Sequence, residues 1–532
     1  MLLLSLFTAT ACIKENVPGP EEVHRKEVVA KFHITLTLGG KDMGGRTRAD
    51  GELDGTSREN HLSSVTLFVV ACNETTEQLD WTNVKYVTLL APPSLSLSSS
   101  ETVDIITTTG KKQIFIGANM SAQQIVSFVL NRGVFRSAGV DYRATIADFV
   151  HPVNGITMFG TAVDLAPANP AKPEIIEVRS NAPDYDIEVD LERVVAKVAL
   201  VYSEDDPLNP SGNVEMDDVT GSYGGFMPAE KVYFMLNNTS KTVNFLHAAS
   251  GTFNIGDYIS YDTSGGGSYY YNTDPRNDFV VYTPTGLIYG QGNTESFGTP
   301  QLQLPLDDDD PYCAPPGIEV YDPTKGDNQK HYDSFLYCLE NRVSTSGFGS
   351  LDPTLVARQG INTQVIVAAR YVPGKINHFD GSTLDLVTVS DMAGMDAITA
   401  LDPNGPGTFY AVYTGNDSPE DYPIYDYYTY GAIDHYEGQP IEDQPAFIVH
   451  KSYLTYKGGY GYYTTFISQP KADKTNDSAY NLDRNYYYVL NITKMTPPGA
   501  SVTPQREYML INSETEKWIN VGEPIEIPVN ED

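Results

Sequence analysis

The chain has 532 residues, 41% of them hydrophobic and 20% charged, so it can bury sizeable cores and does not have the composition of a disordered protein. Its formal net charge of −34 argues against nucleic acid and acidic membrane surfaces as partners, because binding either requires basic patches. The 36 Tyr, together with 44 Gly and 34 Pro, predict an all-β protein of many short strands, and the length predicts more than one domain.

The N-terminus is similar to a bacterial lipoprotein signal. A short apolar run, Leu2 to Phe7, is followed by Ala9-Thr10-Ala11 and then by Cys12, although the usual basic residues before the run are missing. We therefore expect export, lipidation at Cys12 and attachment to the outer membrane through that lipid. The alternative is an apolar N-terminus that arises by chance.

The first predicted strand is Glu27–Leu38, in which apolar and polar residues alternate as in a half-buried strand. Its apolar face consists of Phe32, Ile34, Leu36 and Leu38. A Gly-rich segment, GGRTRADGELDG, follows and contains Arg46 and Arg48. On their own, these arginines are most simply solvated loop residues.

Further strands and one helix are predicted along the chain. The helix is Ser121–Leu130, and a stretch rich in Gly, Tyr, Asp and Pro between Ala248 and Tyr332 is expected to open a second domain. The predicted strands are Ser63–Cys72, Lys112–Asn119, Gly155–Ala162, Asp186–Tyr202, Lys231–Asn238, Ser334–Asn341, Thr363–Val372, Tyr453–Ile467 and Arg484–Met495. Alternation returns at the C-terminus, where the apolar set is Ile519, Val521, Ile525, Ile527 and Val529.

No catalytic or cofactor motif is present. The sequence has no P-loop, G-x-S-x-G, H-E-x-x-H or dinucleotide-binding fingerprint, and its nine histidines are scattered, so we expect no enzyme activity, cofactor or metal. Asp307–Asp310 is interpreted as a solvated loop rather than a calcium site. The tyrosine tracts Tyr422–Tyr430 and Tyr460–Tyr463 are interpreted as strand faces rather than sugar platforms. Cys313 and Cys338 are either paired or buried as free thiols.

Several segments stand out in chain order: KQIFIGAN, GITMFG, LERVVAKV, KVYFMLNN with KTVNFL, FLYCLEN, TQVIVAARYV and RNYYYVLNI. In this order they resemble the fimbrillins of Bacteroidales, above all the larger shaft subunit of the minor fimbriae of Porphyromonas. The regions that the resemblance does not cover are Ala248–Tyr332 and Gly374–Val449.

The resemblance implies an all-β fold of two transthyretin-like β-sandwich domains in tandem, with a few short helices. It also implies export as a lipoprotein, cleavage after an Arg by an arginine-specific protease, and loss of the first strand, whose groove is then filled by a strand of another subunit. Under that scheme the bond Arg48–Ala49 is the processing site, with Arg46 as the alternative. The C-terminal stretch is then the donor strand that polymerises the protein by strand addition.

These expectations divide the chain into a lipoprotein signal (1–12), a propeptide with the removable strand (13–48), an N-terminal sandwich (49–246) and a C-terminal sandwich (247–532) that ends in the donor strand, about 515–532. The implied partners are further copies of the chain in a head-to-tail filament, accessory tip and anchor subunits, the protease, and host or bacterial surface ligands. The implied location is a cell-surface fimbria. The alternatives are a tip adhesin of the same system and a surface glycan-binding lipoprotein.

Overall fold

The structure is a computed structural model, and all of its regular elements except a few short helices are strands. The all-β class expected from the composition is therefore confirmed. The residues that it describes are 25–38, 61–90, 100–139, 142–151, 154–181, 184–202, 212–214, 216, 224–246, 253–254, 259–262, 268–271, 278–280, 319–321, 330–332, 335–344, 362–416, 423–467, 480–501 and 509–517.

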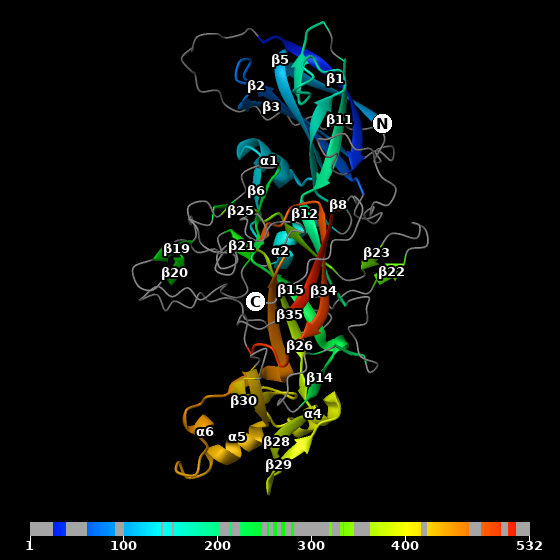
Figure 1. The fold of residues 1–532 in the computed structure, drawn as a ribbon. Coiled ribbons are helices and arrows are strands. Elements are labelled where there is room, and N and C mark those ends of the chain that lie inside the picture. The colour runs from blue at the N-terminus through cyan, green and yellow to red at the C-terminus, as the bar shows by residue number, and fades with distance from the viewer. Residues whose placement is uncertain are drawn as a thin grey trace.

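An eight-stranded sheet forms the N-terminal part, at the top of Figure 1, in the order β3-β2-β5-β9-β11-β1-β4 with β10 paired to β5. The end strands β3 and β4 contact each other, so the sheet curls around its own core. The strands are β1 (Glu27–Leu38), β2 (Ser64–Cys72), β3 (Leu79–Leu90), β4 (Ser100–Thr108), β5 (Gly110–Ala118), β9 (Met158–Asp164), β10 (Ile175–Val178) and β11 (Asp184–Arg193).

Both faces of this sheet are apolar along β2. Val65 and Leu67 face the enclosed core, whereas Phe68 faces outward onto helix α1 (Ala122–Leu130), where its ring lies 4.4 Å from that of Phe128. The helix begins where predicted, because Ser121 and Gln124 form a reciprocal capping box at its N-terminus. The sheet is thus covered on its outer face as well as filled inside.

The chain leaves this sheet at Val194. The predicted strand Asp186–Tyr202 is in fact two strands, β11 in the first sheet and β12 (Val195–Tyr202) in a second one. Sheet membership therefore changes at Val194, well before the compositional change at 246/247. Composition carries no information on which sheet a strand joins.

The second part, below the first in Figure 1, contains two sheets around one core. Their orders are β24-β12-β34-β35 and β15-β26-β33, and a small sheet, β13-β14-β27, adjoins them. The strands are β24 (Leu336–Leu339), β34 (Tyr486–Met495), β35 (Met509–Lys517), β15 (Val232–Asn237), β26 (Gln364–Arg370), β33 (Tyr460–Phe466), β13 (Asn213–Val214), β14 (Gly225–Pro228) and β27 (Val372–Pro373).

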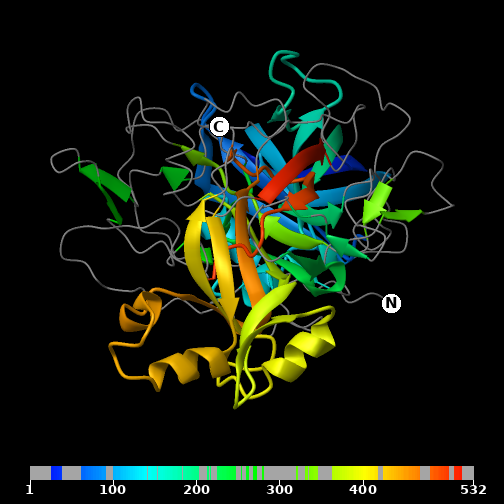
Figure 2. The same cartoon turned by 60° about the horizontal axis from the view of Figure 1, so that its bottom comes forward.

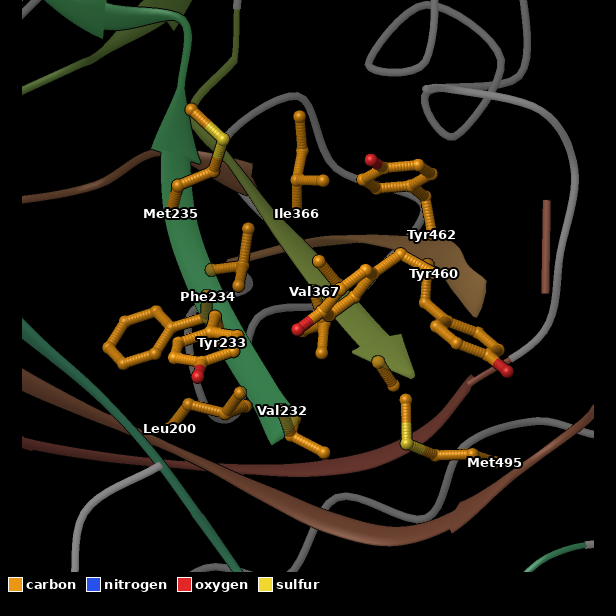
Figure 3. Packing of buried hydrophobic residues seen from close by; sticks show 14 of the residues in the cluster. Leu200, Val232, Tyr233, Phe234, Met235, Ile366, Val367, Tyr460, Tyr462 and Met495 are labelled. Atoms are coloured by element: carbon orange, nitrogen blue, oxygen red, sulfur yellow. The ribbon is translucent and has the colours of Figure 1, made fainter. Parts of the chain in front are cut away.

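The tyrosine tract of β33 lies in this second core (Figure 3). Tyr460 and Tyr462 are buried among apolar residues of β15 and β26, and the hydroxyl group of Tyr463 donates a hydrogen bond to the carbonyl oxygen of Thr496 at 2.8 Å. Buried rings with satisfied hydroxyl groups cannot form a sugar-stacking platform. This observation confirms the interpretation of the tract as a strand face.

The region without a sequence match forms a distal unit at the bottom of Figure 1, which Figure 2 brings forward. Its five-stranded sheet has the order β29-β28-β31-β30-β32 and carries short helices. Its elements are β28 (Lys375–Phe379), β29 (Leu384–Thr388), α4 (Met392–Ile398), β30 (Phe409–Asn416), β31 (Pro423–Tyr428), α5 (Tyr430–Glu437), α6 (Ala446–Val449), β32 (Leu454–Tyr456) and the 3-10 turn Lys457–Gly459.

Short pairs of strands complete the described fold. They are β6 (Val134–Arg136) with β17 (Thr242–Asn244), β7 (Val150–His151) with β8 (Gly155–Ile156), β16 (Thr239–Ser240) with β21 (Phe279–Val280), β18 (Phe253–Asn254) with β25 (Val343–Ser344), β19 (Ile259–Asp262) with β20 (Ser268–Tyr271), and β22 (Glu319–Tyr321) with β23 (Lys330–Tyr332), beside helix α2 (Tyr142–Ala147) and a 3-10 turn at Ala229–Lys231.

Cys338 is a buried free thiol, and burial raises its pKa above the usual range. Cys313, its candidate disulfide partner, lies outside the described residues. Within the described part of the chain, no helix is long and apolar enough to cross a membrane.

Buried charges join the first sheet to the second. The Nε atom of Arg484, just before β34, lies 3.2 Å from Oε2 of Glu192 at the end of β11, and its Nη1 atom donates to the carbonyl oxygens of Asn244 at 3.0 Å and Phe245 at 3.3 Å. Glu340 is buried in the same junction, and desolvation raises its pKa from the ordinary value of 4.5 to about 7 although Arg484 opposes this shift. The junction therefore contains a carboxyl group that is protonated in mildly acidic solution.

Glu340→Gln is expected to flatten the pH dependence of stability between about pH 4.5 and 7. A carboxyl group with a raised pKa binds its proton in the folded state before the unfolded state does, so the wild-type protein loses stability as the pH rises through this window, by on the order of 3 kcal/mol. Urea unfolding of both proteins from pH 4 to 8 measures the difference. Parallel curves for the two proteins would contradict the assignment.

Candidate functional site: the groove that holds the first strand

β1 is an interior strand of the N-terminal sheet. It pairs in parallel with β11, from Lys31 opposite Asp184 to Leu38 opposite Leu191, and antiparallel with β4, from Glu27 opposite Thr108 to Thr35 opposite Ser100. A strand with hydrogen-bonded neighbours on both sides is part of the sheet rather than an appendage. The predicted strand and its bounds are thus present in the structure.

The inward face of β1 fills the enclosed core. Ala30, Phe32, Ile34 and Leu36 are all at most 3% exposed, and the Phe32 ring lies 5.4 Å from that of Tyr185 on β11. Their burial is a consequence of strict alternation, which sends every second side chain to the same face. Three of the four predicted face residues therefore meet in one core, and the fourth, Leu38, ends the strand in register with Leu191.

The outward face of β1 is only partly covered. Val29 is 56% exposed, and its register partner on β4, Ile106, is 52% exposed. His33 shares a hydrogen bond of 2.9 Å between its Nδ1 atom and Oγ1 of Thr102. The strand is held mainly from one side, by its inward side chains and its backbone ladders.

Arg25 anchors the beginning of β1 on the β2–β3 hairpin. Its Nη2 atom donates to the carbonyl oxygen of Cys72 at 2.7 Å and lies 3.5 Å from Oε1 of Glu74, and its Nη1 atom lies 4.0 Å from Oδ2 of Asp80. Sequence reasoning missed this residue because it precedes the alternating segment. Its contacts mean that the loss of β1 would also leave two carboxylates without their cation.

Loss of β1 would open a groove between β11 and β4. Both strands would then present unpaired backbone groups, and Tyr185, Val103 and Ile187 would lose their partners in the core. Exposed strand edges above an apolar floor are a strong template for pairing with another chain. The geometry is that of a site for one extended strand with alternating apolar side chains.

Solved structures similar to this chain include a fimbrilin from Porphyromonas gingivalis, with 12% identity over 93% of this chain and 99% of the other at a TM-score of 0.38. A candidate cell adhesion protein from Parabacteroides distasonis has 12% identity, covers 92% of this chain and 100% of the other, and has a TM-score of 0.39. The tip fimbrial protein of Porphyromonas gingivalis with a C-terminal truncation has 10% identity, covers 91% and 99%, and has a TM-score of 0.31.

No family model matches the chain, and no curated protein matches it significantly. The solved structures found are thus fimbrilins and candidate adhesion proteins of Bacteroidales, the group that the sequence segments resemble. Identities and TM-scores this low do not assign a function, which is argued below from the residues of the groove.

The predicted processing residues lie between β1 and β2, outside the described residues, as does Cys12. The strands that flank Arg48 and Ala49 in the chain, β1 and β2, are not neighbours in the sheet. The segment from 39 to 60 is the only covalent link between β1 and everything that follows it in the chain. A cut at Arg48 would leave β1 attached by non-covalent contacts alone.

The predicted donor residues Ile519, Val521, Ile525, Ile527 and Val529 also lie outside the described residues. The stretch expected to donate, about 515–532, begins within β35, whose last residues Thr515 to Lys517 pair with Tyr488 to Tyr486 of β34. β35 is the edge strand of its sheet. The last described strand of the chain is therefore an edge strand of the second part.

No group of three or more His, Cys, Asp or Glu side chains that could hold a metal ion occurs among the described residues. One charged residue of the groove was not foreseen. Lys112 of β5 is 1% exposed, although the strand was expected from KQIFIGAN. The sequence could have predicted its burial, because Lys112 lies two residues before Ile114 and alternate residues of a strand face the same side.

Proposed function

We propose that this protein is a structural subunit of a cell-surface fimbria, exported as a lipoprotein through Cys12, cleaved after Arg48 and polymerised by donor-strand exchange. The supporting observation is that β1 is an interior strand whose only covalent link to the rest of the chain runs through the segment with Arg46 and Arg48. One cut in that segment leaves β1 held by non-covalent contacts alone, and the departure of β1 then opens an acceptor groove.

The C-terminal residues of another copy are the proposed occupant of that groove. Ile519, Val521, Ile525, Ile527 and Val529 have the alternation that the inward face of β1 has, and they follow the last described strand directly. Pro524 and Pro528 have the opposite parity and would each remove one ladder hydrogen bond. A tail given to one neighbour and a groove open to another make a head-to-tail contact that does not close, which produces a filament.

The net negative charge of each subunit opposes assembly, so the contact between subunits must depend on the burial of apolar side chains. After cleavage at Arg48, 28 basic and 64 acidic residues would remain in each subunit. Subunits with such an excess of one sign repel each other at long range, and only short-range burial in the groove offsets this. The filament would display the loops and the distal unit of every copy, which supports adhesion through multivalency.

Limited digestion with an arginine-specific protease tests the proposal. The full chain carrying Cys12→Ser, which removes lipid attachment, is expected to be trimmed to a chain that begins at Ala49 and then to form oligomers that resist SDS. Arg46→Ala should leave this result unchanged. Arg48→Ala should either move the cut to Arg46, in which case assembly continues, or abolish the cut and with it assembly. N-terminal sequencing and gel electrophoresis measure both steps.

A chain that lacks residues 518–532 should be trimmed normally yet remain monomeric. Long polymers of this shortened chain would rule out the tail as donor. A tip adhesin would accept a strand but have no use for its own tail, so it would form dimers with a donor subunit and no homopolymer. A glycan-binding lipoprotein would remain intact and monomeric under the same conditions.

A further inference from the structure

Lys112 of β5 is a buried cation at the border of the core that β1 completes. On β5 it has the parity of Ile114, Ile116 and Ala118, which face the enclosed core, whereas Phe115 faces the opposite side. Its side chain is 1% exposed. The core that β1 completes is lined mainly by apolar side chains, with the hydroxyl group of Thr107 and the ammonium group of Lys112 as buried polar groups.

The ammonium group is poorly compensated in the unprocessed protein. Its Nζ atom donates to the carbonyl oxygen of Thr109 at 3.2 Å, and no carboxylate among the described residues lies within ion-pair distance of it. Burial and then the charge of Arg25 lower its pKa to about 8. The carboxylates of Glu74 and Asp80 attract it only from beyond ion-pair distance. A buried charge without a direct counterion is costly.

Lys112 lies at the end of the groove where β1 begins. Thr109, which accepts its hydrogen bond, donates its backbone N–H to the carbonyl oxygen of Lys26 at 2.8 Å and accepts the Lys26 N–H on its Oγ1 atom at 3.0 Å. The inward positions nearest this end of β1 are those of Val28 and Ala30. A strand that replaced β1 would place its early inward side chains there.

The C-terminal tail contains one charge at inward parity. Between Ile519 and Val529 every second residue is apolar except Glu523, whereas Glu526 has the opposite parity. A shift of the tail by one residue would turn all of its apolar side chains away from the core. A tail seated in the groove must therefore bury the Glu523 carboxylate.

We propose that Lys112 is the counterion of Glu523 from the tail of a second copy, and that this pair sets the register of the incoming strand. This inference rests on the proposed donor-strand function. The ammonium group of Lys112 is buried without a direct ion pair, and the carboxylate of Glu523 interrupts an apolar face of the tail. Pairing would neutralise both charges. The departure of Arg25 with β1 removes a cation whose charge acts on Lys112, and it also releases Glu74 and Asp80.

The register that follows also matches side-chain size. With the tail running in the direction of β1 and Glu523 at the position of Ala30, Val521 replaces Val28 and Ile527 replaces Ile34, so both positions keep their residue type. Ile525 then replaces Phe32, and Val529 replaces Leu36. The only charged inward residue of the tail thus falls on the smallest inward residue of β1, at the end where Lys112 lies.

A double-mutant cycle on the trimmed full-length protein tests the pair. Lys112→Met leaves Glu523 buried without a counterion and is expected to slow polymer formation about 100-fold, because breaking a buried pair by removing one partner is strongly unfavourable. The double variant Lys112→Met with Glu523→Leu replaces the pair by apolar groups and is expected to restore assembly to within about threefold of wild type. Polymer formation is followed by gel electrophoresis and light scattering.

Two matched controls lie beside the pair. Lys111→Met removes the neighbouring cation, whose Nζ atom binds Oε1 of Glu77 at 2.7 Å away from the core, and Glu526→Leu removes the tail carboxylate of opposite parity. Both should assemble at the wild-type rate. Lys112→Met is expected to fold, since it replaces a buried charge by an apolar side chain of similar length, and thermal unfolding of the untrimmed protein checks this.

The outcomes separate this inference from the proposed function. If wild type fails to polymerise after trimming, or polymerises without residues 518–532, donor-strand exchange by the tail is wrong and the pair falls with it. If wild type and both controls assemble but Lys112→Met assembles equally fast, or the double variant is no better than Lys112→Met, the pair is wrong and the proposed function stands.

Discussion

Phe32→Ala is expected to destabilise the unprocessed protein by about 3–5 kcal/mol, the range for removal of a large aromatic side chain from a packed core. Phe32 is fully buried at the centre of β1 and its ring lies 5.4 Å from that of Tyr185. The strand cannot shift to fill the cavity, because backbone hydrogen bonds to β11 and β4 hold it on both sides. Urea unfolding followed by tyrosine fluorescence measures the loss.

Val29→Ala is the matched control on the same strand. Its side chain is 56% exposed on the opposite face, so the change should stay within about 0.5 kcal/mol of wild type. After cleavage with an arginine-specific protease, Phe32→Ala should also release the first strand faster than Val29→Ala does. Equal stability of the two variants would mean that the inward face of β1 does not hold the sheet together.

Arg484→Ala is expected to cost about 3 kcal/mol, because it removes the cation that joins the two sheets and leaves buried acceptors without a donor. Arg484 is 5% exposed and binds Glu192 and the carbonyl oxygens of Asn244 and Phe245. The change also removes the positive charge that opposes the raised pKa of Glu340. The loss of stability should therefore be accompanied by a further upward shift of that pKa.

Arg179→Ala provides the comparison for an exposed ion pair. Arg179 lies 2.6 Å from Glu177, with side chains 52% and 47% exposed, and such pairs contribute about 0–1 kcal/mol. Thermal unfolding of both variants at pH 7 should show a clear drop for Arg484→Ala and almost none for Arg179→Ala. A drop of similar size in both would mean that the junction does not depend on Arg484.

The two parts of the molecule serve different ends in the proposed filament. The N-terminal sheet holds the groove, and the second core positions β35, from which the tail continues. The junction at Arg484 connects the groove of a subunit to its own donor end.

Local patterns in the sequence determined the strand Glu27–Leu38, its buried face and the helix after Ser121. Alternation fixes which side chains share a face, and a capping box fixes where a helix begins, and both depend only on neighbouring residues. The same patterns identified β33 as a strand face in spite of its tyrosines.

Only the tertiary structure decided which strands became partners. The parallel pairing of β1 with β11, the change of sheet at Val194 and the distal sheet of 375–456 all join residues far apart in the chain. An alternating pattern predicts which side chains of a strand share a face, but it does not predict which strand lies next to it. The hydrogen bonds between strands come from the backbone and are alike for every sequence. The contacts that Thr109 makes with both Lys112 and Lys26 also join residues far apart in the chain, so they too depend on the closed sheet.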